Sequence, residues 1–198
     1  MKIKNPEWLE MKVSGQTVYG LDQLWYQERF RRTAGCGPTT AATLLLYLNK
    51  REGGLLQYQN HNVESAVFML NDVWRFVRPG SRGLYKIEEF VKGIHELCAH
   101  YGIAWQCHEM QVTKETPAHE AASFIKDGIA ADSPVAFLNL HKGEATAFES
   151  WHWIVLTGIK QKQDLFIASG LDGGKKIEFN LVQWITTTQK GGGFVYLT

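Results

Sequence analysis

Ala34-Gly35-Cys36-Gly37-Pro38-Thr39-Thr40 leads into the apolar run Ala41-Ala42-Thr43-Leu44-Leu45-Leu46, and the rest of the chain is organised around this segment. Proline is tolerated in the first turn of a helix, because its missing N–H would have no intrahelical partner there. Beyond it, apolar residues recur at the spacing of one helical face. The pattern predicts a buried helix over residues 38–50, with Cys36 at its N-terminus.

A helix N-terminus is a chemically active place for Cys36. Unpaired backbone N–H groups and the positive end of the helix dipole point there. This is one of the few settings that stabilises a nucleophilic thiolate. Glycine on both sides leaves room for another backbone or a substrate. The alternative is a small buried hydrophobic residue, as most free cysteines are. A nucleophilic Cys36 requires a base, a group that orients the base and an oxyanion donor.

Length and composition limit the classes of protein to which this chain can belong. A chain of 198 residues predicts one domain over 1–198, with a helical part over about 1–102 and a sheet part over about 103–198. The net charge of +1 favours neither nucleic acid nor an anionic membrane as partner. No apolar run approaches the roughly 20 residues of a spanning helix, and the first residues lack the apolar region of a secretory signal. The three cysteines are few and odd in number, which argues against a disulfide framework. This favours a cytoplasmic location.

Hydrophobic periodicity divides the chain into a helical half and a strand-rich half. Residues 1–33 show no sustained period and are expected to be irregular. Further helices are predicted at 63–77 and 87–101. A polar loop containing Gln57, Gln59, Asn60 and His61 precedes the first of these. In the second half a helix is predicted at 117–130, with Thr116 as its N-cap. Strands are predicted at 103–112, 134–140, 151–159, 164–168, 175–179 and 194–197.

Two glycine-containing pairs in the second half, Asp172-Gly173 and Gly192-Gly193, are typical of tight turns between strands. Helices that precede strands, instead of alternating with them, argue against βαβ units. The sequence therefore predicts an α+β fold with a largely antiparallel sheet.

His152 is the candidate base. It opens the segment His152-Trp153-Ile154-Val155-Leu156-Thr157-Gly158, an apolar strand that follows a polar loop. A histidine at the start of such a strand can reach a cleft. Imidazole titrates near neutral pH, so it can take the thiol proton and return it to a leaving group. The alternative is a hydrogen-bonded core histidine.

Cys-Gly-Pro-Thr at 36–39, followed far downstream by His-Trp-Ile-Val-Leu-Thr-Gly at 152–158, resembles the papain-like cysteine peptidases. The pattern is most similar to the branch related to bacteriocin-leader (double-glycine) peptidases. This resemblance implies an N-terminal helical lobe, carrying the cysteine helix, packed against a C-terminal antiparallel sheet that carries the histidine. It also implies hydrolysis of peptide or other amide bonds through a thioester acyl-enzyme, with a peptide or protein as substrate.

The same resemblance implies two supporting residues. An Asp or Asn at the end of the next strand would hold the imidazole, but Ser169 stands at that position and Asp172 comes three residues later. Either Asp172 reaches back, Ser169 substitutes for it, or Asp172 serves only a hairpin turn. A glutamine before the cysteine would donate to the oxyanion. Gln27 is the nearest candidate and Gln23 the alternative, and either could be a surface residue.

No metal or other cofactor is predicted, because Cys98, His100, Cys107 and His108 match no standard zinc spacing. The first functional hypothesis is therefore a thiol hydrolase that uses Cys36, His152 and Asp172. A catalytically inactive binding domain with the same fold is the alternative, and an amidase or transamidase would use the same centre.

Overall fold

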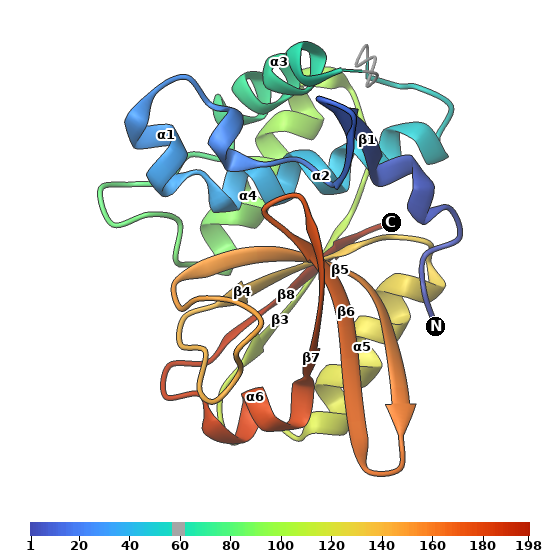
Figure 1. The fold of residues 1–198 in the computed structure, drawn as a ribbon, viewed down its shortest axis with the longest axis vertical. Coiled ribbons are helices and arrows are strands. Elements are labelled where there is room, and N and C mark those ends of the chain that lie inside the picture. The colour runs from blue at the N-terminus through green and yellow to red at the C-terminus, as the bar shows by residue number, and fades with distance from the viewer. Residues whose placement is uncertain (57–61) are drawn as a thin grey trace.

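A computed structural model of the chain describes residues 1–56 and 62–198, and the predicted polar loop at 57–61 lies outside the described residues. The helical half stands at one end of an antiparallel sheet (Figure 1). It contains α1 (Arg29–Ala34), α2 (Cys36–Arg51), α3 (Val63–Trp74) and α4 (Ile87–Tyr101). Two of the predicted helices are confirmed nearly residue for residue, while α3 ends three residues before the predicted 77. The α+β class is confirmed.

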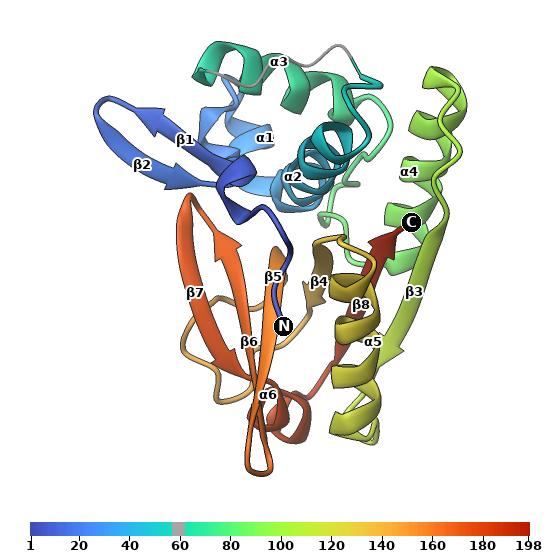
Figure 2. The ribbon, with the colours of Figure 1, turned by 90° about the vertical axis from the view of Figure 1, so that its right-hand side faces the viewer.

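The main sheet has six strands in the order β3-β8-β4-β5-β6-β7, and all neighbouring strands are antiparallel. Its strands are β3 (Cys107–Val112), β4 (Val135–Asn139), β5 (His152–Lys162), β6 (Leu165–Asp172), β7 (Lys175–Asn180) and β8 (Gly192–Leu197). The helices α5 (Ala118–Ala130) and α6 (Leu181–Thr187) pack against this sheet (Figure 2). Within the described residues, no helix combines the length and apolarity needed to cross a bilayer.

The helix α2 is the centre of the core. Every residue from Gly37 to Asn49 is buried, and the helix packs against α3 on one side and β5 and β4 on another. A helix that is covered all round is the expected outcome for a segment with few charges. Cys36, as the first residue of this helix, is thereby held at the junction of the helical half and the sheet.

The first 28 residues are more regular than the sequence predicts. They form two short 3₁₀ helices, η1 (Pro6–Leu9) and η2 (Gln23–Trp25), and a separate hairpin of β1 (Glu10–Val13) and β2 (Gln16–Tyr19). The expectation of an irregular segment was wrong here. The hairpin strands have four residues each, and Met11 is their single fully buried side chain. Elements this short and exposed carry no readable period.

Two predictions about local structure were also wrong. Thr116 does not cap α5, whose N-cap is Pro117, because the Thr116 hydroxyl instead accepts from the Thr113 N–H at 2.9 Å. The Gly192-Gly193 pair is not a turn but opens the buried strand β8. A Cβ on Gly193 would overlap the Ile87 side chain and the Met110 carbonyl, so glycine is needed for close packing instead of for a turn.

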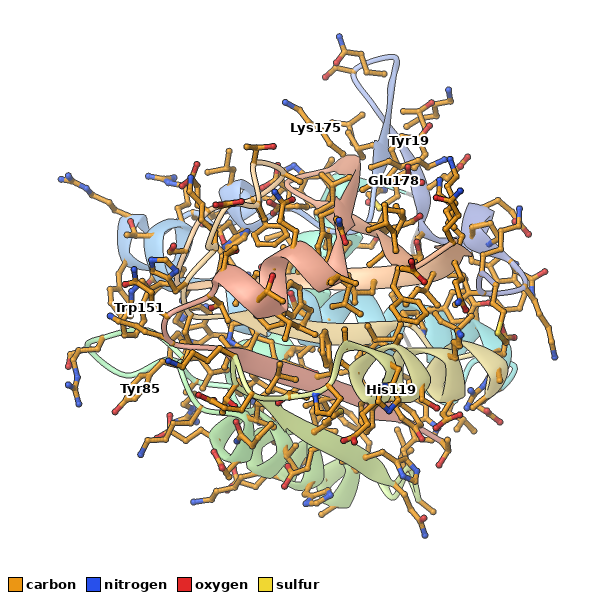
Figure 3. The ribbon with its side chains drawn as sticks, turned by 90° about the horizontal axis from the view of Figure 1, so that it is seen from below. Tyr19, Tyr85, His119, Trp151, Lys175 and Glu178 are labelled. Carbon is orange, nitrogen blue, oxygen red and sulfur yellow. The ribbon has the colours of Figure 1, made fainter. Side chains whose placement is uncertain are left out.

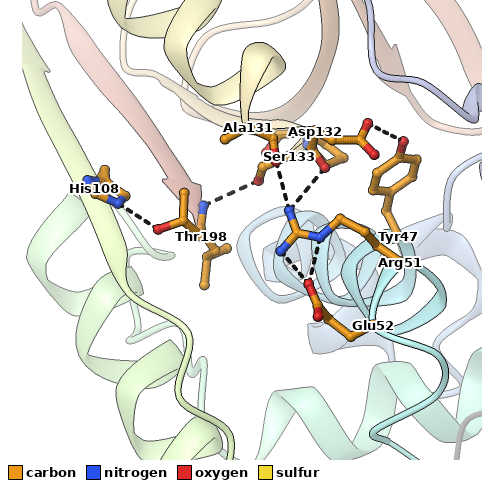
Figure 4. Close-up of polar contacts among 10 residues, drawn as sticks. Tyr47, Arg51, Glu52, His108, Ala131, Asp132, Ser133 and Thr198 are labelled. Atoms are coloured by element: carbon orange, nitrogen blue, oxygen red, sulfur yellow. Dashed lines mark hydrogen bonds and ion pairs between the residues drawn. The ribbon is translucent and has the colours of Figure 1, made fainter.

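A polar network fixes α2 to the turn between α5 and β4 (Figure 4). The buried carboxylate of Asp132 accepts from the Tyr47 hydroxyl at 2.7 Å and from the Lys4 N–H at 2.8 Å. Burial raises the pKa of Tyr47 to about 12. The Arg51 guanidinium donates to the carbonyl oxygens of Ala131 and Asp132. Because these bonds join the helical half to the sheet, they fix the relative position of the two surfaces that meet at Cys36.

Candidate active site

The space beside the two glycines that flank Cys36 is filled by other side chains of the protein. A Cβ on Gly35 would lie 2.8 Å from the Tyr26 ring, and a Cβ on Gly37 would lie 2.7 Å from the Leu84 side chain. The expected room for another backbone or a substrate is therefore filled by packing. Glycine on both sides lets the start of α2 sit tightly against its surroundings while the half-buried Cys36 keeps access to solvent.

His152 is the first residue of β5 and lies between Cys36 and Asp172. Its Nε2 is 2.7 Å from the Asp172 Oδ1, and the Cys36 side chain is close enough to influence its pKa. Since Nε2 faces Asp172, Nδ1 is the nitrogen that remains for the thiol. Burial acts to lower the pKa of His152, but the hydrogen bond to Asp172 and the interaction with Cys36 raise it to about 10. The imidazole is therefore a cation at neutral pH.

Asp172 is both the last residue of β6 and the partner of His152. The hairpin turn itself is made by Gly173 and Gly174, both with positive φ, so Asp172 stands one position before it. Ser169 is turned elsewhere, because its hydroxyl donates to Glu178 on β7 at 3.0 Å. Of the two residues considered for the third position, the structure brings Asp172 to the imidazole and leaves Ser169 away from it.

The two candidate glutamines are placed very differently. Gln23, in η2, lines a cavity together with Cys36 and His152, and its side-chain Nε2 donates to the Arg32 carbonyl at 2.9 Å. Gln27 is exposed and does not line that cavity. The helix α1 occupies most of the chain between Gln27 and Cys36, and the glutamine nearer in sequence is not the one that shares a cavity with the thiol.

Cys36 lies where two cavities meet. We call the first the imidazole cavity, lined by Gly20, Leu21, Asp22, Gln23, Leu24, Cys36, Thr39, Thr40, Thr43, His152, Trp153, Val155, Leu171, Asp172 and Gly173. We call the second the aromatic cavity, lined by Phe30, Thr33, Ala34, Cys36, Ser81, Arg82, Gly83, Leu84, Tyr85, Leu138, Leu140 and Trp151. Among the residues that the structure describes, Cys36 alone lines both cavities. A substrate that reaches its thiol can therefore extend in two directions.

The loop beside the aromatic cavity is held by residues that the sequence analysis missed. The Trp153 indole N–H donates to the Leu84 carbonyl at 2.7 Å inside the core, and the Leu84 side chain packs against Gly37. Trp153 also stacks on Phe90, with ring centroids 4.4 Å apart. No local pattern identifies such a long-range anchor, although the position of Trp153 directly after His152 is suggestive once the strand is placed.

The other two cysteines lie outside this site. Cys98 is buried in α4, and burial raises its thiol pKa. Burial, followed by the nearby Cys98 and Glu109, raises the pKa of Cys107 to about 12. Both are therefore thiols at neutral pH. In the part of the chain that the structure describes, no group of three or more His, Cys, Asp or Glu side chains is placed to hold a metal ion.

A cysteine at the start of a buried helix, facing a histidine and an aspartate on an antiparallel sheet, defines the papain-like class of α+β proteins. The model of the Peptidase C39-like family matches residues 21–180, and the chain belongs to this family. The matched range begins two residues before η2 and ends with β7, so it contains Cys36, His152 and Asp172. A search of the curated proteins found no match.

Proposed function

We propose that this chain is a thiol hydrolase that cleaves peptide or other amide bonds through Cys36, His152 and Asp172. The observation that carries the proposal is the contact of Asp172 with the His152 ring in the same cavity as Cys36, which lies where two cavities meet. Nucleophile, base and orienting group are the three parts that covalent acyl transfer requires. The contact between Asp172 and His152 supports this proposal over a catalytically inactive binding domain with the same fold.

The proposed reaction begins with a thiolate–imidazolium pair of Cys36 and His152. The Cys36 sulfur forms a bond to the substrate carbonyl carbon, and the C–N bond breaks as the proton on His152 Nδ1 passes to the leaving nitrogen. This leaves a thioester. A water molecule then attacks the thioester carbonyl carbon and His152 takes its proton. The C–S bond breaks, and the carboxylic acid product leaves. The thiolate–imidazolium pair is restored, so no other reactant is required.

Gln23 is the side-chain oxyanion donor in this proposal, together with the Cys36 backbone N–H. Gln23→Ala is expected to lower kcat/KM about 10²-fold, because one oxyanion donor is lost while the nucleophile and base remain. Gln27→Ala is the matched control and is expected to leave the rate unchanged, since Gln27 is exposed outside the imidazole cavity. Equal effects of the two substitutions on amide hydrolysis would exclude Gln23 from this role.

The reactivity of Cys36 tests the proposal before any substrate is known. The native protein is treated with iodoacetamide at pH 6, and the labelled cysteine is identified by peptide mapping. We expect Cys36 to react faster than glutathione under the same conditions, because an imidazolium beside the sulfur favours the thiolate. Cys98 and Cys107 are expected to stay unlabelled, since burial raises both of their pKa values. A Cys36→Ala variant identifies any background labelling.

Turnover separates a hydrolase from its alternatives. Acyl-peptide aminomethylcoumarins report release of the amine, and the Cys36→Ala variant supplies the blank. A Cys36 no more reactive than glutathione, together with no turnover, would overturn the proposal in favour of a binding domain. If a product appears only when an amine is added, the same centre acts as a transamidase.

A further inference from the structure

Arginine side chains are gathered on one part of the molecule. Six of the seven arginines fall within residues 28–34 and 71–82, where only two residues are acidic. The rest of the chain carries 15 basic and 18 acidic residues, so the small net charge of the chain hides an uneven distribution. We call these six side chains the arginine surface. They are Arg29, Arg31, Arg32, Arg75, Arg78 and Arg82.

The two segments that carry the arginine surface lie against each other. The Arg31 guanidinium, on α1, donates to the side-chain oxygen of Asn71, on α3, at 2.7 Å. The loop that follows α3 reaches the same place, because Arg82 lines the aromatic cavity together with Phe30 and Thr33 of α1. Figure 1 shows α1 and this loop on the same side of the molecule. The arginine surface therefore occupies one side of the molecule and borders the aromatic cavity.

Three guanidinium groups of this surface are held over aromatic rings. The pairs are Arg31 with Trp74 at 5.1 Å, Arg75 with Phe76 at 5.3 Å and Arg82 with Tyr85 at 5.2 Å. A guanidinium has several N–H donors in one plane, so stacking on a ring fixes the group and leaves its edge able to donate. Five of the six arginines are exposed and Arg31 is half-buried. The surface therefore presents accessible positive charge, part of which is already ordered for binding.

Much of this positive charge has no carboxylate beside it. The two ion pairs of the surface are Arg75 with the buried Asp72 at 2.9 Å and Arg31 with Glu28 at 3.4 Å. Within the described residues, the side-chain hydrogen bonds of Arg32, Arg78 and Arg82 go to neutral acceptors, namely backbone carbonyl oxygens and the Tyr85 hydroxyl. A neutral acceptor does not cancel the charge of a guanidinium, so these arginines can still pair with an anionic partner.

The shape of a guanidinium matches both carboxylates and phosphates, so other features decide the partner. A polynucleotide carries a charge at every phosphate, and a strand that runs beyond the arginine surface would meet the net acidic remainder of the chain. Three aromatic rings of the surface are covered by guanidinium groups, which hinders the base stacking that single strands use. A polypeptide can confine its carboxylates to one segment and therefore fits this surface better.

We propose that the arginine surface binds an acidic segment of a polypeptide, whose Asp and Glu carboxylates pair with the guanidinium groups. This binding requires no reaction at Cys36, so it goes beyond the proposed function. Because the surface borders the aromatic cavity, which Cys36 also lines, a polypeptide bound there lies at the rim of the cavity that leads to the thiol.

Fluorescence anisotropy of the native protein with two fluorescein-labelled peptides tests the proposal. One peptide has five Glu-Gly repeats and the other has five Gln-Gly repeats, both with capped ends, so they differ in charge and hardly in size. At 25 mM NaCl we expect the Kd of the glutamate peptide to be at least about tenfold lower, as several exposed ion pairs together predict. At 300 mM NaCl most of this difference should disappear, because salt screens exposed charges.

A triple variant locates the binding. It carries Arg29→Gln, Arg78→Gln and Arg82→Gln, which leaves both ion pairs of the surface in place, and it is expected to lose most of the preference for glutamate. The matched control removes the same charge from exposed lysines elsewhere through Lys114→Gln, Lys162→Gln and Lys175→Gln. Lys175 lies at another edge of the molecule than Tyr85, the ring under Arg82 (Figure 3). This control is expected to keep the preference.

Three results would contradict the inference. It is wrong if both peptides bind equally at 25 mM NaCl, or if the two triple variants lose the preference to the same extent, since only net charge would then matter. A thymidine hexanucleotide carries as many charges as the glutamate peptide. If it binds the native protein more tightly than that peptide and loses affinity in the arginine variant, the surface recognises phosphate and the inference is again wrong. Rapid alkylation of Cys36 alongside any of these results would leave the proposed function standing.

Discussion

His152→Ala is expected to slow amide hydrolysis about 10⁴-fold, near the upper limit for loss of one acid–base group. Two consequences add in this variant. The sulfur of Cys36 loses the cation that favours the thiolate, and the leaving nitrogen loses its proton donor. The first consequence predicts that alkylation of Cys36 at pH 6 falls to the rate of a free thiol. The second predicts that hydrolysis falls further than alkylation does.

The loss of hydrolysis rate, compared with the loss of alkylation rate, separates the two roles of His152. Alkylation by iodoacetamide needs a thiolate but no proton for a leaving nitrogen, so it reports the ion pair alone. His119→Ala is the control. His119 is exposed on α5 (Figure 3), so this substitution removes an imidazole from the surface only. If His152→Ala keeps the wild-type rate of alkylation at pH 6, the base that activates Cys36 must be sought elsewhere.

The residues of the candidate site whose placement could be predicted are those with a local signal. A proline in the first turn and an apolar period both indicate the helix α2. The position of Cys36 at the start of this helix could therefore be predicted from about 15 consecutive residues. His152 opens a strong apolar strand. Asp172 could be named only as one of two candidates, because the register of the β6–β7 hairpin decides which side chain faces the imidazole.

The parts that were missed depend on contacts between distant segments. Gln27 is nearer to Cys36 in sequence, yet α1 fills the intervening chain and Gln23 lies at the cavity. Gly37 is a glycine because Leu84 packs on it, 47 positions away. The left-handed backbone of Trp151 contradicts the preference of a bulky residue for negative φ. Predictions from sequence rely on such local preferences and therefore miss it. Such conflicts concentrate at functional sites, where the fold imposes a costly conformation.

Asp172→Ala is expected to slow hydrolysis about 10³-fold, while Ser169→Ala leaves it unchanged. Asp172 accepts from the His152 ring at 2.7 Å and so holds Nδ1 toward the thiol, whereas the Ser169 hydroxyl donates to Glu178. Without the carboxylate the ring can rotate and its cation is less stable. Asp172→Asn keeps an acceptor but not the charge, so its rate is expected to lie between those of the wild type and Asp172→Ala.

The pH profile of kcat/KM for amide hydrolysis, which needs the His152 proton for the leaving nitrogen, shows whether Asp172 acts through His152. The hydrogen bond to Asp172 is the largest contribution that raises the pKa of His152, which reaches about 10 against the opposing effect of burial. The upper midpoint of the profile, where the imidazolium loses its proton, is therefore expected near pH 10 in the wild type. In Asp172→Ala this midpoint should move to lower pH. A purely structural role of Asp172 would lower the amount of folded protein without moving the midpoint.

The stability of the folded chain should follow the same titration. The pKa of His152 is about 10 in the folded chain and 6.5 ordinarily, so protonation of its imidazole favours the folded state. This stabilisation is fully present below pH 6.5 and is lost as the pH rises through 10. Because Asp172 supports the raised pKa, the free energy of unfolding of Asp172→Ala is expected to fall below that of the wild type by more at pH 6 than at pH 10.5, in denaturant melts at both values. A difference that does not depend on pH would mean that Asp172 stabilises the β6–β7 hairpin without supporting the imidazolium.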